Sequence, residues 1–486
     1  MQLSRPRKRI LQTLLSGFII GVVCAFVLRD IHPFRRECAC VDNDRPGPDA
    51  SLPTVTVNAV CTPADSLSQK DSAEESKTDL DPRPIIAVDP FDPLEWLNGP
   101  PALSYKDNLQ KHTKYITSWG SSAGWTNDVI SFINLIYLGL ITDRVTILPV
   151  FMSTHLPGHA PALMFGDVFN ISRLRTALEK PVLEWREVKQ SDSPILDDIG
   201  CWNVWESSQY NDLGPRHSNV PWKLNLDVSY TKTPYWIKMI PNFEHDQHCT
   251  FWSLAALAFP AGRKANLVPA LPSFQHRLSL PPDDHLLCYD FLYYVAAQEP
   301  FEIALDYSPA WRYVGQYMRW TDPLVKLADE YVRRTLGVDA TEPIPPFISI
   351  HARRDDFQGW CGDFTLDECF APLEVINRRV QEVKAELFQR KAIMVHHIII
   401  TSDEKDKKWW AQVARYGWVS PDHRQTEERY GIWYPVLIDA VIQSQGIGFV
   451  GTDRSTMSIL AARRVESWRD GAVRFVLWGR PGADDH

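Results

Sequence analysis

The feature that most constrains the fold is a regular alternation of apolar runs and helix-period segments over residues 347–476. The runs are short and rich in Val, Ile and Phe, which predicts strands, while between them apolar residues recur every three or four positions, which predicts helices. We expect strands at 347–350, 397–401, 447–452 and 473–476, and helices at 372–388, 405–415, 435–445 and 455–465. Strands that alternate with helices form parallel sheets, so this part of the chain is predicted to be a doubly wound α/β domain.

The same pattern occurs once more, earlier in the chain. A strand at 114–117 is followed by a turn at 120–124 with two glycines, a helix at 128–141 and a strand at 145–149. Asn127 or Asp128 would cap the helix, and a further helix is predicted at 322–336. We therefore expect two Rossmann-like halves, 86–335 and 336–486, that face each other across a cleft.

Basic residues followed by an apolar run predict a membrane anchor at the amino terminus. Residues 1–9 carry four basic side chains, and residues 10–28 form an uncharged run that would be ~28 Å long as a helix, enough to cross a bilayer. The flanking charges favour a cytosolic tail at 1–9. The alternative is a cleaved signal peptide, which would have a shorter apolar core and a small-residue cleavage site.

Residues 29–85 are rich in Asp, Ser, Pro and Thr and show no apolar periodicity, so they predict a disordered stem. The sequence thus predicts a single-pass type II protein of the Golgi or endoplasmic reticulum membrane, with its folded part in the lumen. Asn170 begins an N-glycosylation sequon, which agrees with that location.

The cysteines also favour an oxidising compartment. Apart from Cys24, which falls in the predicted span, eight of the nine cysteines lie on the luminal side, an even number that suits disulfides. Cys361 and Cys369 are close enough in sequence to close a small loop, and the other pairings stay open. The chain has 51 Lys and Arg against 60 Asp and Glu, so it lacks the basic surplus of a nucleic-acid-binding protein.

Two arginines follow the strand predicted at 347–350. Arg353 and Arg354 stand where a parallel sheet holds its ligand, and a guanidinium offers a planar fork to phosphate oxygens. This pattern favours an anionic ligand. The alternative is that one of the arginines pairs with Asp355 or Asp356 and ties down a loop.

A second anion site is predicted at the start of the helix at 455–465. Ser455 and Thr456 open this helix, whose free backbone N–H groups attract anions. Simple N-capping by Ser455 is the alternative. The glycines at 446–451 match the letters G-x-G-x-x-G but run along a strand, so they do not predict a dinucleotide loop. The acidic triplets at 42–44 and 79–81 fall in the stem, so no metal site is expected.

Four motifs occur in a characteristic order. They are a glycine-and-asparagine loop at 124–128, H-x-R-R-x-D-F at 351–357, T-S-D-E at 401–404, and F-x-G-T followed by S-T-M-S at 449–458. Together they resemble the GDP-fucose protein O-fucosyltransferase family, over about residues 114–478. The resemblance implies a GT-B-like fold and transfer of fucose from GDP-fucose to a hydroxyl, without an obligatory metal or other cofactor.

The resemblance also implies roles for individual residues. Arg353 would grip the β-phosphate and stabilise the departing GDP, which makes it the catalytic residue. The residues that would bind GDP-fucose together with Arg353 are Gly124, Trp125, Asn127, His351, Asp356, Asp439, Ser455 and Thr456.

The sequence departs from the family at two positions. Some members place a Glu in the loop at 124–128 as a base toward the acceptor, and here the nearest carboxylate is Asp128. Met457 replaces the usual aromatic residue. The base is therefore unassigned. The expected acceptor is Ser or Thr of a secretory-pathway protein, and the alternatives are a glycan hydroxyl or an inactive protein that binds nucleotide or glycoprotein.

Overall fold

The computed structural model describes residues 91–209 and 212–485, which belong to the compact unit Arg83–His486. The predicted cytosolic tail, membrane span and stem, residues 1–85, lie outside the described residues. Within 91–209 and 212–485, no helix combines the length and apolar character that a membrane crossing requires.

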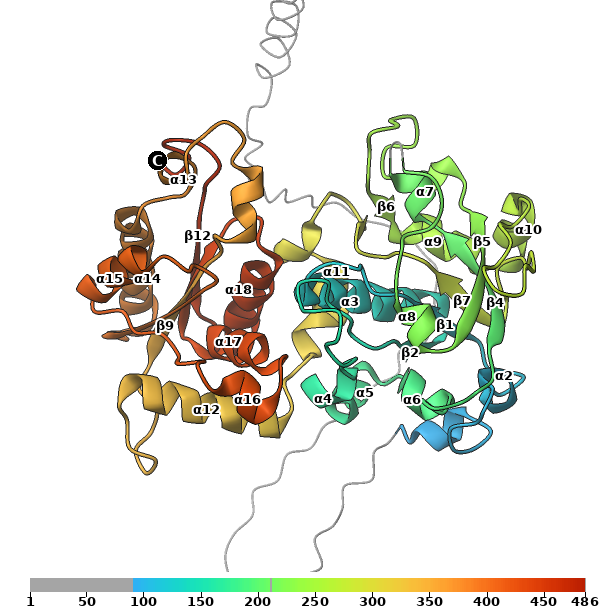
Figure 1. The fold of residues 1–486 in the computed structure, drawn as a ribbon, viewed down its shortest axis with the longest axis horizontal. Helices are drawn as coiled ribbons and strands as arrows, with labels where there is room; N and C mark the ends of the chain where they lie inside the picture. The colour runs from blue at the N-terminus through green and yellow to red at the C-terminus, as the bar shows by residue number, and fades with distance from the viewer. Residues whose placement is uncertain (1–90, 210–211, 486) are drawn as a thin grey trace, which may run out of the picture. The chain divides into compact units, whose positions relative to one another are not determined.

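The first half of this unit is built on a six-stranded parallel sheet (Figure 1). Its order is β3-β2-β1-β7-β4-β5, so β1 has β2 on one side and β7 on the other. The strands are β1 (Tyr115–Ser118), β2 (Val145–Leu148), β3 (Val182–Glu184), β4 (Asp197–Asn203), β5 (Leu226–Lys232) and β7 (Leu286–Tyr289). The predicted strands at 114–117 and 145–149 are thereby confirmed.

Helices cover this sheet, and a short parallel pair stands beside it. The pair is β6 (Cys249–Thr250) and β8 (Val295–Ala296). In this half, the helices of five or more residues are α3 (Trp125–Thr142), α5 (Ile171–Leu178), α9 (Phe251–Leu257), α10 (Pro260–Asn266) and α11 (Pro309–Tyr313), and the single-turn helices are α2 (Tyr105–Asn108), α4 (Phe165–Val168), α6 (Trp185–Val188), α7 (Trp205–Ser208) and α8 (Val220–Lys223). The next helix, α12 (Asp322–Leu336), packs against α17 (Tyr434–Gln445) of the second half (Figure 1). Helix α12 has the bounds predicted from the sequence.

Helix α3 corrects one expectation. It begins at Trp125, three residues before the predicted start, and its N-cap is Gly124, which offers no side-chain hydrogen bond. Asn127 and Asp128 therefore both lie within the first turn, and neither is the predicted cap. Asp128 has another role. Its Oδ1 accepts hydrogen bonds from the backbone N–H of Ser121 (2.7 Å) and from the Ser121 hydroxyl (2.9 Å), so it braces the loop after β1.

The second half is a four-stranded parallel sheet of order β10-β9-β11-β12. Its strands are β9 (Phe347–Ala352), β10 (His397–Ser402), β11 (Gly448–Thr452) and β12 (Ala472–Val476), and its helices are α13 (Leu366–Cys369), α14 (Leu373–Lys391), α15 (Lys407–Arg415), α16 (Thr426–Tyr430), α17 (Tyr434–Gln445) and α18 (Thr456–Arg469). All the predicted strands and helices of this half are present. Strand β9 runs two residues farther than predicted, so His351 lies inside it.

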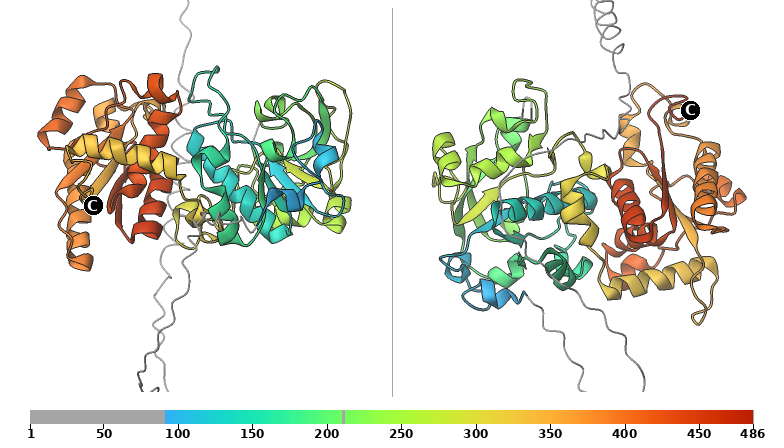
Figure 2. Two further views of the ribbon diagram at one scale, coloured as in Figure 1. Left: turned by 90° about the horizontal axis from the view of Figure 1, so that it is seen from below. Right: turned by 180° about the vertical axis from the view of Figure 1, so that it is seen from behind.

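Helices pack on both faces of the second sheet, α14 and α15 on one and α17 and α18 on the other (Figure 1, Figure 2). Alternation along β9 and β11 explains this, because Ile350 and Val450 belong to the core under α14 while Phe449 packs with α18. Strand β9 has β10 on one side and β11 on the other. The order of strand addition reverses there, and open α/β sheets bind ligands at such a switch point.

Two disulfides link described residues. Cys361–Cys369 closes the predicted small loop, and Cys201–Cys288 joins the neighbouring strands β4 and β7. Among the cysteines of the described segments, Cys249 is a buried free thiol. The sequon residue Asn170 is the N-cap of α5 and accepts a hydrogen bond from Arg173 N, and its glycosylation stays a prediction.

Candidate functional site

A cavity of about 720 Å³ lies at the carboxyl ends of strands from both sheets. One wall is formed by the loops after β1 and β2 and by the first turn of α3, and the other by the loops after β9, β10 and β11. Seven of the nine residues predicted to bind the donor line it: Gly124, Trp125, Asn127, Arg353, Asp356, Ser455 and Thr456.

Arg353 is held in this cavity by two carboxylates. Its Nε lies 2.7 Å from Asp356 Oδ1, its Nη2 lies 2.7 Å from Asp356 Oδ2, and its Nη1 lies 3.1 Å from Asp403 Oδ2. Its backbone N–H donates to Thr452 Oγ1 at the end of β11. The predicted alternative, pairing with Asp356, is thus realised, and the same pairs fix the guanidinium at the cavity wall.

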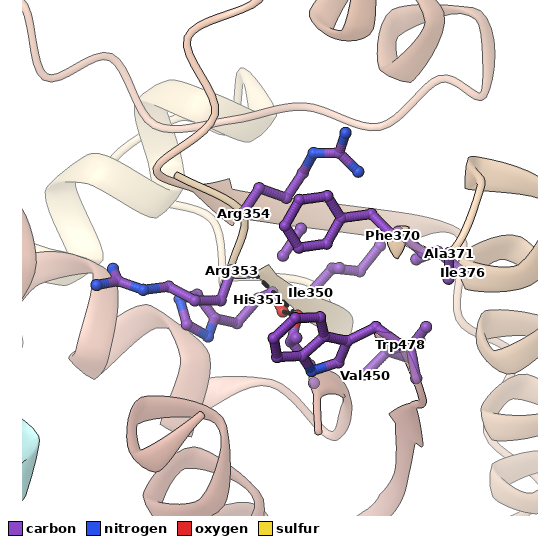
Figure 3. A pocket seen from close by; sticks show the side chains of 13 residues that line it. Ile350, His351, Arg353, Arg354, Phe370, Ala371, Ile376, Val450 and Trp478 are labelled. Carbon is purple, nitrogen blue, oxygen red and sulfur yellow. Dashed lines mark hydrogen bonds between the residues drawn. The ribbon is translucent and has the colours of Figure 1, made fainter. Parts of the chain in front are cut away.

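Arg354 leaves the strand end in a different direction (Figure 3). Its Nε lies 2.6 Å from Glu404 Oε2, and its guanidinium lies over the rings of Phe370 (4.6 Å) and Trp409 (5.3 Å). The side chain is 13% exposed and does not line the large cavity. The two neighbouring arginines therefore differ, since one faces the cavity and the other packs between elements.

The first turn of α18 meets the first turn of α3 in the cavity. Ser455 is the N-cap of α18, as the alternative interpretation held, and its Oγ accepts from Ser458 N. The Thr456 hydroxyl donates to Asn127 Oδ1 at 2.7 Å and lies 2.7 Å from the Thr126 hydroxyl. Two helix N-termini thus converge, and their free N–H groups and dipoles favour a negatively charged ligand.

Two of the predicted residues do not line the large cavity. His351 is buried, and its Nδ1 lies 2.8 Å from Ser458 Oγ, which also accepts from Thr452 N. Burial, with the charge of Arg353, lowers the pKa of His351 to about 3, so the ring is neutral. Through Ser458, His351 therefore connects strand β9 with the first turn of α18 and the end of β11. Asp439 Oδ1, on α17, lies 2.8 Å from Nε2 of His423.

Among the charged or titratable residues of the cavity that sequence reasoning did not assign to the site are His155, Asp403 and Arg454. Each follows the end of a strand, in the loops after β2, β10 and β11. That position was the available signal, because ligand-binding side chains gather at the carboxyl ends of parallel strands. Asp403 lies within the quoted T-S-D-E motif, whereas His155 lies in no motif.

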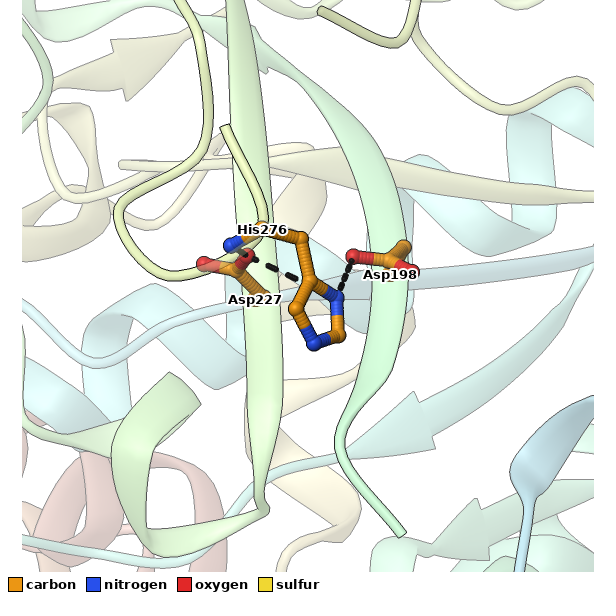
Figure 4. Close-up of side chains that lie close together, drawn as sticks. All are labelled: Asp198, Asp227 and His276. Atoms are coloured by element: carbon orange, nitrogen blue, oxygen red, sulfur yellow. Dashed lines mark hydrogen bonds and ion pairs between the residues drawn. The ribbon is translucent and has the colours of Figure 1, made fainter. Parts of the chain in front are cut away.

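A separate cluster is formed by Asp198, Asp227 and His276 (Figure 4). Each offers one side-chain atom that could bind a metal ion, and these atoms lie within 4.8 Å of one another. His276 Nδ1 lies 2.8 Å from Asp198 Oδ1, and Asp227 accepts backbone hydrogen bonds from Gln275 and His276. These bonds tie the segment around His276 to β4 and β5. None of the three residues lines the large cavity.

The model of the family described as GDP-fucose protein O-fucosyltransferase matches residues 115–467. No curated protein sequence gives a significant match. Among solved structures, POFUT1 in complex with GDP-fucose is 15% identical, with a TM-score of 0.46 over 74% of this chain and 98% of that chain. The fucosyltransferase NodZ from Bradyrhizobium is 11% identical, with a TM-score of 0.36 over 72% of this chain and 93% of that chain.

Proposed function

The chain belongs to the GDP-fucose protein O-fucosyltransferase family, and we propose that its large cavity binds GDP-fucose with the diphosphate between Arg353 and the first turn of α18. The chain is a GDP-fucose-dependent fucosyltransferase that moves fucose to an acceptor hydroxyl. One observation carries the placement of the donor, namely that Arg353 and Thr456 line the same cavity at the switch point of the second sheet.

Positive groups lie where the diphosphate is proposed to bind, although Asp355, Asp356 and Asp403 also line the cavity. Arg353 and Arg454 supply positive charge, and the N-termini of α3 and α18 add the partial positive charge of their free N–H groups. A phosphate can bind Arg353 in a fork-like manner, because guanidinium N–H groups match a pair of phosphate oxygens. Asp356 and Asp403 hold the guanidinium in place before the donor arrives, which reduces the ordering that binding requires.

The reaction breaks the bond between the anomeric carbon and a β-phosphate oxygen, whose electron pair leaves with GDP. Negative charge therefore develops on the β-phosphate in the transition state, next to Arg353. A fixed cation at that place stabilises the transition state more than the ground state, which raises the rate. Arg353 thus acts as the catalytic residue of the proposal.

The other cavity residues bind the donor. Thr456 and the neighbouring N–H groups of α18 would hold phosphate oxygens, since the first N–H groups of a helix have no intrahelical partner. Gly124 and Asn127 approach from the other half. Trp125 contributes through its backbone and the start of α3, because its ring is 3% exposed and packs with Phe169 and Trp320.

The acceptor, the fold family and the location complete the proposal. The family's description supports Ser or Thr of a protein as the acceptor, and two parallel α/β sheets that share a cavity support a GT-B-like arrangement. Two disulfides support a luminal site in the Golgi or endoplasmic reticulum. We propose that residues 10–28 anchor the chain there, and that Asn170 is glycosylated.

A thermal-shift screen of the full-length protein in detergent tests this function. GDP and GDP-fucose should raise Tm, because a ligand that binds only the folded state stabilises it by mass action. UDP-sugars are the matched control and should leave Tm unchanged. The protein should also release GDP from GDP-fucose, and the rate of release should be the same with and without EDTA. A protein whose Tm responds to neither GDP nor GDP-fucose would contradict the donor assignment.

A further inference from the structure

The proposed reaction must remove the proton of the acceptor hydroxyl. Some family members use a Glu in the loop at 124–128 for this, and Asp128, the nearest carboxylate in this chain, cannot accept the proton. Asp128 is 1% exposed, its Oδ1 is occupied by two hydrogen bonds from Ser121, and it does not line the cavity. The proton acceptor must therefore be sought among the groups that do line the cavity.

The three carboxylates of the cavity are engaged with cations. Asp356 and Asp403 both pair with Arg353, and Asp355 Oδ2 lies 2.5 Å from Lys405 Nζ. Proton transfer to Asp356 or Asp403 would remove the charge that positions Arg353. The cavity also contains Tyr293, and burial raises the pKa of its hydroxyl, which stays protonated.

His155 is a cavity residue of different character, placed by a short network on the loop after β2. The Ser153 hydroxyl and Thr154 N both donate to Ala123 O (3.3 and 3.0 Å), and His155 N donates to Ser153 Oγ (3.2 Å). This network fastens the histidine to the turn that precedes α3.

The imidazole ring lies directly against Gly124. A Cβ at Gly124 would be 3.0 Å from Cε1 and 3.1 Å from Nδ1 of His155, closer than a side chain tolerates without displacing the ring. The absence of a side chain at Gly124 thus lets the ring occupy this position. The glycine of the loop at 124–128 therefore has a packing role toward His155.

The same edge of the ring also reaches the proposed phosphate site. Nδ1 of His155 lies 3.5 Å from Nη2 of Arg353. This distance is at the long limit for a hydrogen bond, and a phosphate bound to Arg353 would compete for the guanidinium. The reacting carbon is joined to that phosphate through one oxygen, so a donor whose phosphate is bound to Arg353 would place this carbon in the part of the cavity that His155 lines.

We propose, on the basis of the function proposed above, that His155 is the general base of the transfer. Nδ1 takes the proton of the acceptor hydroxyl while the hydroxyl oxygen bonds to the anomeric carbon. The bond from that carbon to the β-phosphate oxygen breaks, and its electron pair leaves with GDP. The imidazolium then returns its proton to water once the products have left.

The electrostatic surroundings suit this role. His155 is exposed at the cavity wall, yet the surrounding protein partly desolvates its ring. This desolvation and then the charge of Arg353 lower the pKa of His155, while Asp356 and Asp403 oppose them. The net shift is downward, so the ring is neutral at pH 7. A guanidinium N–H can only donate, so the contact with Arg353 favours the tautomer with its hydrogen on Nε2, in which Nδ1 has a free lone pair. Activity should therefore fall on the acid side of neutrality, as the ring becomes protonated.

The test is the hydrolysis of GDP-fucose by the full-length protein, with water as the acceptor. His155→Gln should lower the hydrolysis rate about 100-fold or more, the usual effect of losing a general base, and should remove the acid limb of the pH profile. GDP affinity, measured by calorimetry, should stay within about twofold, and added imidazole should restore part of the rate in His155→Gly. His159→Gln is the matched control, since His159 is an exposed histidine of the same loop that does not line the cavity.

Two outcomes would overturn the proposal. One is an unchanged rate and pH profile in His155→Gln. The other is a loss of GDP affinity that accounts for the loss of rate, which would make His155 a donor-binding residue. Failure of the donor assignment is distinct, because it appears in the wild-type protein as absent GDP binding, and that result would remove this proposal as well.

Discussion

Replacement of Arg353 by Ala should lower turnover strongly while leaving the fold almost unchanged. The side chain is 23% exposed, and its partners Asp356 and Asp403 are 44% and 21% exposed. Ion pairs this accessible contribute about 0–1 kcal/mol to stability. For a folded unit of this size that corresponds to a Tm change of about 2 °C or less.

The effect on catalysis should be much larger. Arg353 is the side chain positioned to meet the charge that develops on the β-phosphate, and loss of one such electrostatic group costs about 3–4 kcal/mol of transition-state stabilisation. That corresponds to a fall in kcat of about 100- to 1000-fold. The assay is GDP release from GDP-fucose, measured together with thermal unfolding of the same preparation.

Arg354→Ala is the matched control, because the two arginines are neighbours on the chain. Arg354 and its partner Glu404 are 13% and 12% exposed, and the Arg354 guanidinium also packs over Phe370 and Trp409. Loss of a hydrogen bond to a charged group costs about 1.5–3 kcal/mol, and the lost packing on the two rings adds to this cost. Arg354→Ala should therefore lower Tm strongly. Two results would refute the catalytic role of Arg353. One is near-normal turnover in Arg353→Ala, and the other is a loss of turnover that is explained entirely by unfolding.

Three further predictions concern the groups around the cavity. Thr456→Val removes the hydroxyl that donates a hydrogen bond to Asn127. Calorimetry should therefore show about tenfold weaker GDP binding. Unchanged GDP affinity would contradict a role of the first turn of α18 in donor binding. Burial raises the pKa of Asp128 to about 7. The folded state therefore binds this proton more tightly than the unfolded state, so the free energy of unfolding should fall as pH rises from about 4 to 7. In urea titrations Asp128→Asn should show a weaker pH dependence of that free energy, and the same pH dependence in both proteins would contradict the raised pKa. Replacing Cys361 and Cys369 by Ser opens a short loop with a sequence separation of 8, which should lower the urea-unfolding free energy by about 2–3 kcal/mol, and an unaltered midpoint would argue against it.

Much of the second half could be predicted from the sequence, because its signals are local. The strands around Ile350 and Val450 are short apolar runs, and helix α18 begins immediately after a residue, Ser455, whose hydroxyl caps it. Side-chain types at the ends of these strands indicated the anion site. The alternation also placed Arg353 at the edge of the sheet where the cavity lies.

The parts that could not be predicted depend on contacts between distant segments. The sequence does not indicate that Arg354 pairs with Glu404 while Arg353 faces the cavity, since both follow the same strand. The start of α3 was placed too late because Gly124 caps the helix without a side chain. His155 lies in a loop without a motif, and only the three-dimensional structure brings it to Arg353, 198 residues away in sequence.

A structure of the full-length protein with GDP bound would test the central claim most directly. The account predicts that the β-phosphate lies within hydrogen-bond distance of the Arg353 guanidinium and of the backbone N–H groups that open α18. A diphosphate bound elsewhere, with Arg353 still paired only to Asp356 and Asp403, would contradict it.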